Sequence, residues 1–146
     1  MKSVVLYYTF GGSTKQEAEK IGAEQEAPVY RVKEKRNRST FGSFLPGCYQ
    51  ALKRKQSKIL PLEVDLSAFD RIYVGGPVWA ACPAPAVNSI IDLLPAGKEV
   101  EVFLCAGGND PRPSDEVTKQ MIEAKGCKVT KITTIATGKP PAKLKE

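Results

Sequence analysis

Two stretches of the sequence decide the fold: Ser3-Val4-Val5-Leu6-Tyr7-Tyr8 running into Thr9-Phe10-Gly11-Gly12-Ser13-Thr14-Lys15, and Ile72-Tyr73-Val74 running into Gly75-Gly76-Pro77-Val78-Trp79. Each begins with a β-branched and aromatic run, which is typical of a buried strand, and each continues into a segment that contains two glycines. In open parallel sheets, ligands bind beyond the carboxyl ends of the strands. We therefore expect the two segments to meet at one edge of a sheet and to contact one ligand.

The first loop has the features of a phosphate site. Its two glycines let backbone N–H groups approach a ligand closely, it carries three hydroxyl residues, and it leads into a helix whose N-terminus is partially positive. The alternative is a plain turn in which Ser13 is the helix N-cap. Thr14 and not Gly precedes Lys15, and the Gly-x-Gly-x-x-Gly fingerprint is absent. ATP, GTP and a dinucleotide bound in the usual way are therefore disfavoured.

The second segment carries the only Trp of the chain, Trp79, after a turn that Gly and Pro would stiffen. A Trp ring presented from such a turn can stack on a flat ligand, and the alternative is burial in the core. A phosphate and a flat ring at one site together indicate a nucleotide or a flavin.

The chain has 146 residues and a formal net charge of +6, from 22 basic and 16 acidic side chains. The range from Arg31 to Lys58, called the basic stripe below, holds nine of the basic residues and a single acid, Glu34. Such a stripe can meet nucleic acid, an anionic membrane or an acidic protein. The alternative is an ordinary solvated face, since no known nucleic-acid motif accompanies it.

The residue types that are absent exclude several kinds of catalysis. The chain has no His, and its four cysteines form no Cys-x-x-Cys pair: Cys48, Cys82, Cys105 and Cys127. We therefore expect no metal site and no catalytic side chain, and whatever chemistry occurs must be supplied largely by a cofactor. The apolar run from Val4 to Tyr8 is too short for a signal sequence or a membrane span, which predicts a cytoplasmic protein.

The apolar pattern alternates between strands and helices along the whole chain. Strands are expected at about 3–8, 28–32, 70–75, 100–105 and 129–135. Among the helices, 41–56 carries Phe44, Tyr49 and Leu52, 84–94 buries Val87, Ile90, Ile91 and Leu94, and 113–125 buries Val117, Met121 and Ile122. The pattern predicts one α/β domain over residues 1–137 and a basic tail over 138–146. This domain is expected to be a three-layer sandwich with a five-stranded parallel sheet of order 2-1-3-4-5.

These residues resemble the flavodoxin-like family of FMN-binding proteins, and its short-chain members in particular. The stretch Thr9-Phe10-Gly11-Gly12-Ser13-Thr14 is similar to the family's phosphate loop, Thr/Ser-x-Thr-Gly-Asn-Thr, with Gly11 and Ser13 as departures. Residues 69–79 resemble its Tyr-Asp-x-Ile-x-x-Gly-x-Pro-x-Trp segment, residues 81–87 resemble the Pro-rich start of the next helix, and residues 47–52 resemble the Gly-Gly-Tyr/Phe-Gln-Ala-Leu helix of one branch. The match covers nearly the whole chain.

The resemblance implies non-covalently bound FMN and assigns residues to it in three groups. The phosphate is expected at the first loop, the ring at the second segment, and the pyrimidine edge at the end of the fourth strand. The residues concerned are Thr9, Phe10, Gly11, Gly12, Ser13 and Thr14 in the first group, Pro77, Val78, Trp79 and Ala80 in the second, and Cys105, Ala106, Gly107 and Gly108 in the third.

The implied function is electron transfer through the flavin. An FMN-dependent oxidoreductase that uses NAD(P)H to reduce quinones or other small molecules is the alternative, because this chain is basic where typical carriers are acidic and the loop after Ala106 lacks the Tyr that covers the ring in many carriers. A flavin-free interaction module that uses the basic stripe is a third reading. The partner expected is a redox protein, with an acidic one as an option, or a small-molecule electron acceptor. Neither nucleic acid nor a membrane is expected.

Overall fold

The computed structural model describes residues 1–35, 50–51, 53–107 and 112–137. Its strands are β1 (Ser3–Tyr7), β2 (Val29–Arg31), β3 (Arg71–Trp79), β4 (Cys82–Pro83), β5 (Glu99–Ala106) and β6 (Lys128–Ala136). Its helices are α1 (Ser13–Gln25), α4 (Pro85–Asp92) and α5 (Asp115–Glu123), with short 3₁₀ turns at η2 (Leu66–Ala68) and η3 (Arg112–Ser114). The predicted basic tail over 138–146 lies outside the described residues.

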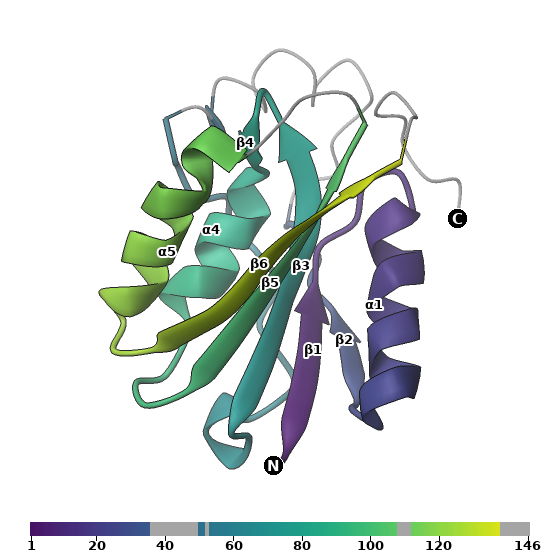
Figure 1. Ribbon diagram of the computed structural model, residues 1–146, viewed down its shortest axis with the longest axis vertical. Helices are drawn as coiled ribbons and strands as arrows, with labels where there is room; N and C mark the ends of the chain where they lie inside the picture. The colour runs from purple at the N-terminus through teal and green to yellow at the C-terminus, as the bar shows by residue number, and fades with distance from the viewer. Residues whose placement is uncertain (36–49, 52, 108–111, 138–146) are drawn as a thin grey trace.

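The main sheet is parallel and has the order β2-β1-β3-β5-β6, while the two-residue β4 pairs antiparallel with the end of β3. Counting only the parallel strands, this is the predicted order 2-1-3-4-5. In Figure 1, α1 covers one face of the sheet, and α4 and α5 cover the other. The predicted three-layer sandwich is therefore confirmed. In the described part of the chain, no helix combines the length and apolar character that a bilayer span requires.

Successive side chains of a strand point to opposite faces of the sheet, and both faces are covered by core clusters. Val4 and Leu6 lie in one buried cluster with Val87 of α4, while Val5 and Tyr7 lie in a second cluster with Ala18 of α1. This period of two is the geometry of a strand with both faces covered. It explains why the first strand reads as a continuous apolar run and shows no alternation of apolar and polar residues.

The buried face of α4 is as predicted, with Val87, Ile90, Ile91 and Leu94 all at 3% exposure or less. The prediction for α5 is wrong in one residue, because Val117 is 43% exposed. Thr118 is fully buried in its place, four positions before the fully buried Ile122 on the same helix face. Thr118 is accommodated because its hydroxyl accepts from Arg54 Nη2 at 2.6 Å. The core position on this helix is therefore occupied by the polar Thr118, whereas the apolar periodicity predicted its neighbour Val117 there.

The chain from 53 to 60 runs beside α4 and is not helical, so the predicted helix over 41–56 ends too late. Residues 50 and 51 are helical, and residues 41–49 and 52, with Phe44, Tyr49 and Leu52, lie outside the described residues. The segment is held by polar side chains of α4: Asn88 Nδ2 donates to the Lys55 carbonyl at 2.9 Å, and Ser89 Oγ accepts from Ser57 N at 3.0 Å. These bonds satisfy backbone groups outside a helix, and a local pattern could not indicate them.

Candidate functional site

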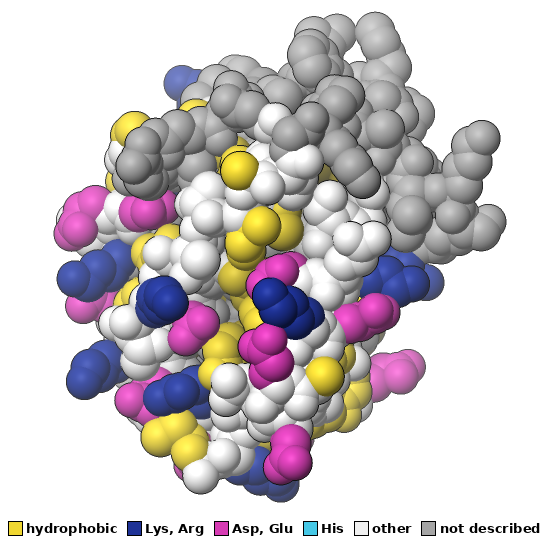
Figure 2. Space-filling model, turned by 45° about the vertical axis from the view of Figure 1, so that its right-hand side comes forward, with side chains coloured by type: hydrophobic (Ala, Val, Ile, Leu, Met, Phe, Trp, Pro, Cys, Tyr) yellow, Lys and Arg dark blue, Asp and Glu magenta, His cyan; other side chains and the backbone are white. Residues whose placement is uncertain are grey.

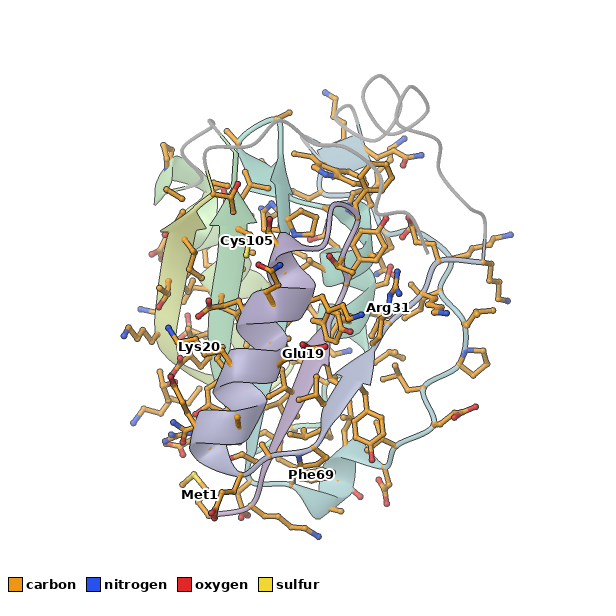
Figure 3. All side chains as sticks on the ribbon, turned by 90° about the vertical axis from the view of Figure 1, so that its right-hand side faces the viewer. Met1, Glu19, Lys20, Arg31, Phe69 and Cys105 are labelled. Atoms are coloured by element: carbon orange, nitrogen blue, oxygen red, sulfur yellow. The ribbon has the colours of Figure 1, made fainter. Side chains whose placement is uncertain are left out.

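The predicted site segments lie at the carboxyl edge of the sheet. The chain leaves β1 toward α1 on one face and leaves β3 toward α4 on the other, so the strand order reverses between these two strands. Binding crevices of open α/β sheets form at such a reversal. In Figure 3, Cys105 marks this edge close to the start of α1, while Met1 and Phe69 lie at the opposite end of the sheet.

The first loop turns into α1 through Gly12, the N-cap residue, whose φ is 92°. This left-handed conformation favours Gly because a Cβ would be strained there. The Gly12 N–H donates to Thr9 Oγ1 at 3.0 Å, which closes the loop on itself. Ser13 is already the first residue of the helix, so the alternative interpretation of Ser13 as N-cap is wrong.

The N-terminus of α1 is suited to an anion. No side chain caps it, and its first turn contains no acidic residue. The first N–H groups of a helix have no acceptor within the helix, and they form the positive end of its dipole. Gly11, directly before this end, is exposed, and Ser13 is half-buried. The donors present therefore fit a phosphate, which carries negative charge and accepts hydrogen bonds.

Two of the three hydroxyl groups of this loop are engaged inside the protein. Thr9 and Thr14 are 5% and 2% exposed. Thr9 Oγ1 accepts from Gly12, as above, and the Thr14 hydroxyl hydrogen-bonds to the Cys105 thiol. Burial raises the pKa of Cys105 above its ordinary value, and the bond with Thr14 lowers it only in part. Both threonines thus shape the loop, and direct contact of their hydroxyls with a phosphate stays a prediction.

The second segment is strand and not loop as far as Trp79, so the predicted end of this strand at residue 75 is wrong. Pro77 lies within the β3–β5 ladder, opposite Cys105. Its carbonyl accepts a hydrogen bond from Ala84 N at 2.9 Å. Gly75 and Gly76 are needed because a Cβ at Gly75 would overlap the Phe103 ring and one at Gly76 would overlap Val87. These glycines therefore serve close packing within the sheet.

The turn follows Trp79, at Ala80 and Ala81, and returns the chain into β4. Their φ values are 51° and 64°, so both central residues of this two-residue hairpin are left-handed. A hairpin of this kind usually has Gly or Asn at these positions. Sequence reasoning missed the hairpin because Ala-Ala carries no turn signal.

Trp79 is 3% exposed and packs edge-to-face against two other aromatic rings. Its ring centroid lies 6.1 Å from that of Tyr8 and 5.7 Å from that of Phe10. Burial in the core, the alternative weighed for this residue, is thus the state in the structure, and stacking of Trp79 on a ligand stays a prediction. The contact with Phe10 nevertheless brings the first loop and the end of β3 together, as expected for one site.

Tyr8, directly after β1, was expected only as a strand residue. Its hydroxyl donates to Glu34 Oε1 at 2.5 Å, although the two residues are 26 positions apart. The aromatic group formed by Tyr8, Phe10 and Trp79 is therefore anchored to the chain that follows β2. The position of a Tyr directly before the glycine loop was the only sequence signal for this role.

The third group of predicted residues lies at the end of β5. Cys105 and Ala106 are each 6% exposed, Gly107 is exposed, and Gly108 lies outside the described residues. The Ala106 carbonyl accepts from the Thr137 N–H at 2.9 Å, so this acceptor is already used within the sheet. Across the described ranges, no three His, Cys, Asp or Glu side chains gather where they could hold a metal ion.

The solved structures that resemble this chain are flavodoxin-like flavoproteins. A flavoprotein from Lactobacillus acidophilus NCFM, solved in complex with FMN, has 23% identity and a TM-score of 0.77, over 91% of this chain and 92% of that one. A flavoprotein from Bacteroides uniformis has 17% identity and a TM-score of 0.79, over 93% and 90% of the two chains. Oxidised flavodoxin 1 from Bacillus cereus has 16% identity and a TM-score of 0.52, over 93% and 86%.

These likenesses establish that the chain has the flavodoxin-like fold, as its motifs indicated. Neither the family models nor the curated proteins contain a match to this sequence.

Proposed function

We propose that this protein binds FMN without a covalent bond at the carboxyl edge of β1, β3 and β5 and transfers electrons through it. The observation that carries the proposal is the start of α1: an uncapped helix end without acidic residues, opened by Gly12 and lying beside the Phe10–Trp79 pair. A phosphate site next to aromatic rings is what a flavin mononucleotide requires. The FMN bound by the Lactobacillus flavoprotein of the same fold adds support.

The chain's own residues would bind and orient this group. The N–H groups at the start of α1, with Gly11 and Ser13, would hold the phosphate. The end of β3, from Pro77 to Ala80, would line the ring on one side, and the end of β5 would face its polar edge. When bound, FMN would supply the capacity to accept and release electrons. The low exposure of Phe10 and Trp79 would keep water from that side.

A reductase of quinones or other small molecules is the second candidate, and one feature favours it. The stretch Cys105-Ala106-Gly107-Gly108-Asn109-Asp110-Pro111 contains no aromatic residue that could cover the outer face of a ring. An uncovered ring face is what a small acceptor needs for direct contact. The carrier and reductase readings therefore differ in access to the ring and share the FMN site.

Absorbance of the purified protein tests the shared part. The expected result is a yellow protein with about one FMN per chain, and titration of the apo-protein should show that FMN binds more tightly than riboflavin, which has no phosphate. A colourless protein that takes up neither ligand would refute the proposal and return the chain to a flavin-free interaction role.

Steady-state oxidation of NAD(P)H then separates the two candidates. A carrier should not oxidise NAD(P)H in the presence of a quinone, whereas a reductase should do so with turnover that saturates in both substrates. The free-FMN reaction at the same concentration is the control.

A further inference from the structure

The two halves of the basic stripe, distant in sequence, are joined side by side in the structure. Glu34 and Ile59 form an antiparallel bridge. Two backbone bonds flank it, from Lys35 N to the Lys58 carbonyl at 2.9 Å and from Leu60 N to the Lys33 carbonyl at 2.8 Å. We call residues 33–35 and 58–60 together the lysine ribbon. It follows β2, whose last residue, Arg31, is labelled in Figure 3, and it therefore lies at the carboxyl edge of the sheet.

The ribbon has two different faces, because side chains alternate along an extended chain. Its inner face carries Glu34, which accepts from the Tyr8 hydroxyl, and Ile59, which packs against the core and against the Trp79 cluster. Its outer face carries the remaining residues, all exposed: Lys33, Lys35, Lys58 and Leu60. The single acid of the stripe is thus turned inward, and the outer face is purely cationic around one apolar side chain, 45% exposed.

This separation of charge is local. On the face of the molecule seen in Figure 2, basic and acidic side chains lie interspersed. Outside the range Arg31 to Lys58, the chain carries 13 basic and 15 acidic residues, so the net positive charge of the protein comes from this range. A concentrated field of one sign steers oppositely charged partners to one place on a surface.

We propose that the lysine ribbon is the docking surface for an acidic redox protein, a step that rests on the proposed electron-transfer function. Docking here would place the partner directly outside the Tyr8–Trp79 pair, and hence beside the candidate flavin site. An apolar side chain surrounded by lysines suits a protein surface with an apolar centre and an acidic rim. Single-stranded nucleic acid needs exposed aromatic rings for stacking, and among the described residues beside the ribbon, Tyr8 and Trp79 are buried, so it is a poorer fit.

Two triple variants test the proposal at equal net charge. The ribbon variant is Lys33→Glu, Lys35→Glu and Lys58→Glu. The control variant is Lys20→Glu, Lys119→Glu and Lys128→Glu, which changes three exposed lysines on α1, α5 and β6. The probe is an oxidised plant-type [2Fe–2S] ferredoxin, a strongly acidic electron carrier. Binding is measured by calorimetry at low and at high salt, with the full-length protein.

The wild-type protein should bind the probe at low salt and lose affinity as salt rises. The ribbon variant should bind at least about tenfold more weakly than wild type, and the control variant no more than about threefold more weakly. Leu60→Ser alone should lower the affinity for ferredoxin a few-fold and leave the salt dependence of binding unchanged. Equal losses in both triple variants would overturn the proposal, because net charge alone would then explain binding.

Two further probes check the class of partner. Binding of a single-stranded DNA of about 20 nucleotides, or of vesicles rich in phosphatidylglycerol, through the same lysines while ferredoxin fails to bind would also overturn it. FMN content is measured separately on all three proteins and should be the same. A wild-type protein without FMN would refute the proposed function. Ferredoxin binding would still test, independently of that result, whether the lysine ribbon is a docking surface.

Discussion

Two turns at the carboxyl edge of the sheet contain left-handed residues, and the chain handles them differently. The turn into α1 uses Gly12, the residue type that this conformation favours, whereas the hairpin after β3 uses Ala80 and Ala81. Left-handed backbone costs an L-residue about 1 to 2 kcal/mol. The first turn is thus specified by its own sequence. The second must be held by what surrounds it, namely the β3–β4 pairing and the packing of Trp79.

The sharpest way to break this comparison is to remove the Trp ring. Trp79→Ala should lower the free energy of unfolding by about 3 to 5 kcal/mol, because a large buried side chain is lost and the strained hairpin loses its support. Urea unfolding followed by circular dichroism measures the change. Trp79→Phe, which keeps an aromatic ring in the cluster, should lose clearly less. An alanine variant as stable as wild type would show that the ring is not core, and would favour the ligand platform.

The turn into α1 should instead show its importance in ligand affinity. Gly12→Val places a β-branched residue at a φ of 92° and should weaken FMN binding by about tenfold or more, or about 1.4 kcal/mol. The affinity for riboflavin should fall less, since riboflavin lacks the phosphate that this loop would hold. Gly97→Val is the matched control, because Gly97 is also left-handed, with a φ of 83°, but lies between α4 and β5 at the opposite end of the sheet, so FMN affinity should stay unchanged there. Equal losses for FMN and riboflavin would place the phosphate elsewhere.

Burial of the Cys105 thiol at the end of β5 should make stability depend on pH. Burial raises the pKa of Cys105, so the folded state favours the neutral thiol; this contribution is complete below the ordinary pKa of 9.0 and is lost as pH rises through the raised value. Unfolding measured from pH 8 to 10.5 should show a loss of at most about 1.4 kcal/mol per pH unit from this group. Cys105→Ala should remove that part of the slope. An identical slope in the variant would assign it to other groups.

The smallest expected effect concerns the hairpin itself. Ala80→Gly should raise the free energy of unfolding by about 0.5 to 1 kcal/mol, because relief of left-handed strain exceeds the added entropy of the unfolded chain. Ala124→Gly, at the end of α5 where φ is −63°, should lower it, since no strain is relieved there. A destabilised Ala80→Gly protein would mean that the Ala80 methyl group makes packing contacts worth more than the strain.

Much of the fold was predictable because apolar strands and glycine loops report directly on burial and turns. The buried face of α4 and the glycine turn before α1 follow from local patterns, and the order of the parallel strands follows from the β–α alternation together with the general rule for doubly wound sheets. The errors share a different cause. Val117 and Thr118 exchanged places because Arg54, far away in the sequence, satisfies the Thr118 hydroxyl. Trp79 was expected on a rim and is buried because Tyr8 and Phe10 close over it. Partners distant in the chain decide both cases.

The position of β1 between β2 and β3 has a consequence for how the chain folds during synthesis. Ser3 of β1 pairs with Arg71 of β3, so the backbone groups on one edge of β1 stay unpaired until a strand made much later is available. At about 5 to 20 residues per second, the ribosome needs about 3 to 14 s to make the intervening chain. Among the described strands made by then, the three-residue β2 is the one that pairs with the apolar run of β1. The nascent chain therefore exposes an aggregation-prone strand for seconds, and trigger-factor-type chaperones that cover apolar segments at the tunnel exit should raise its folding yield.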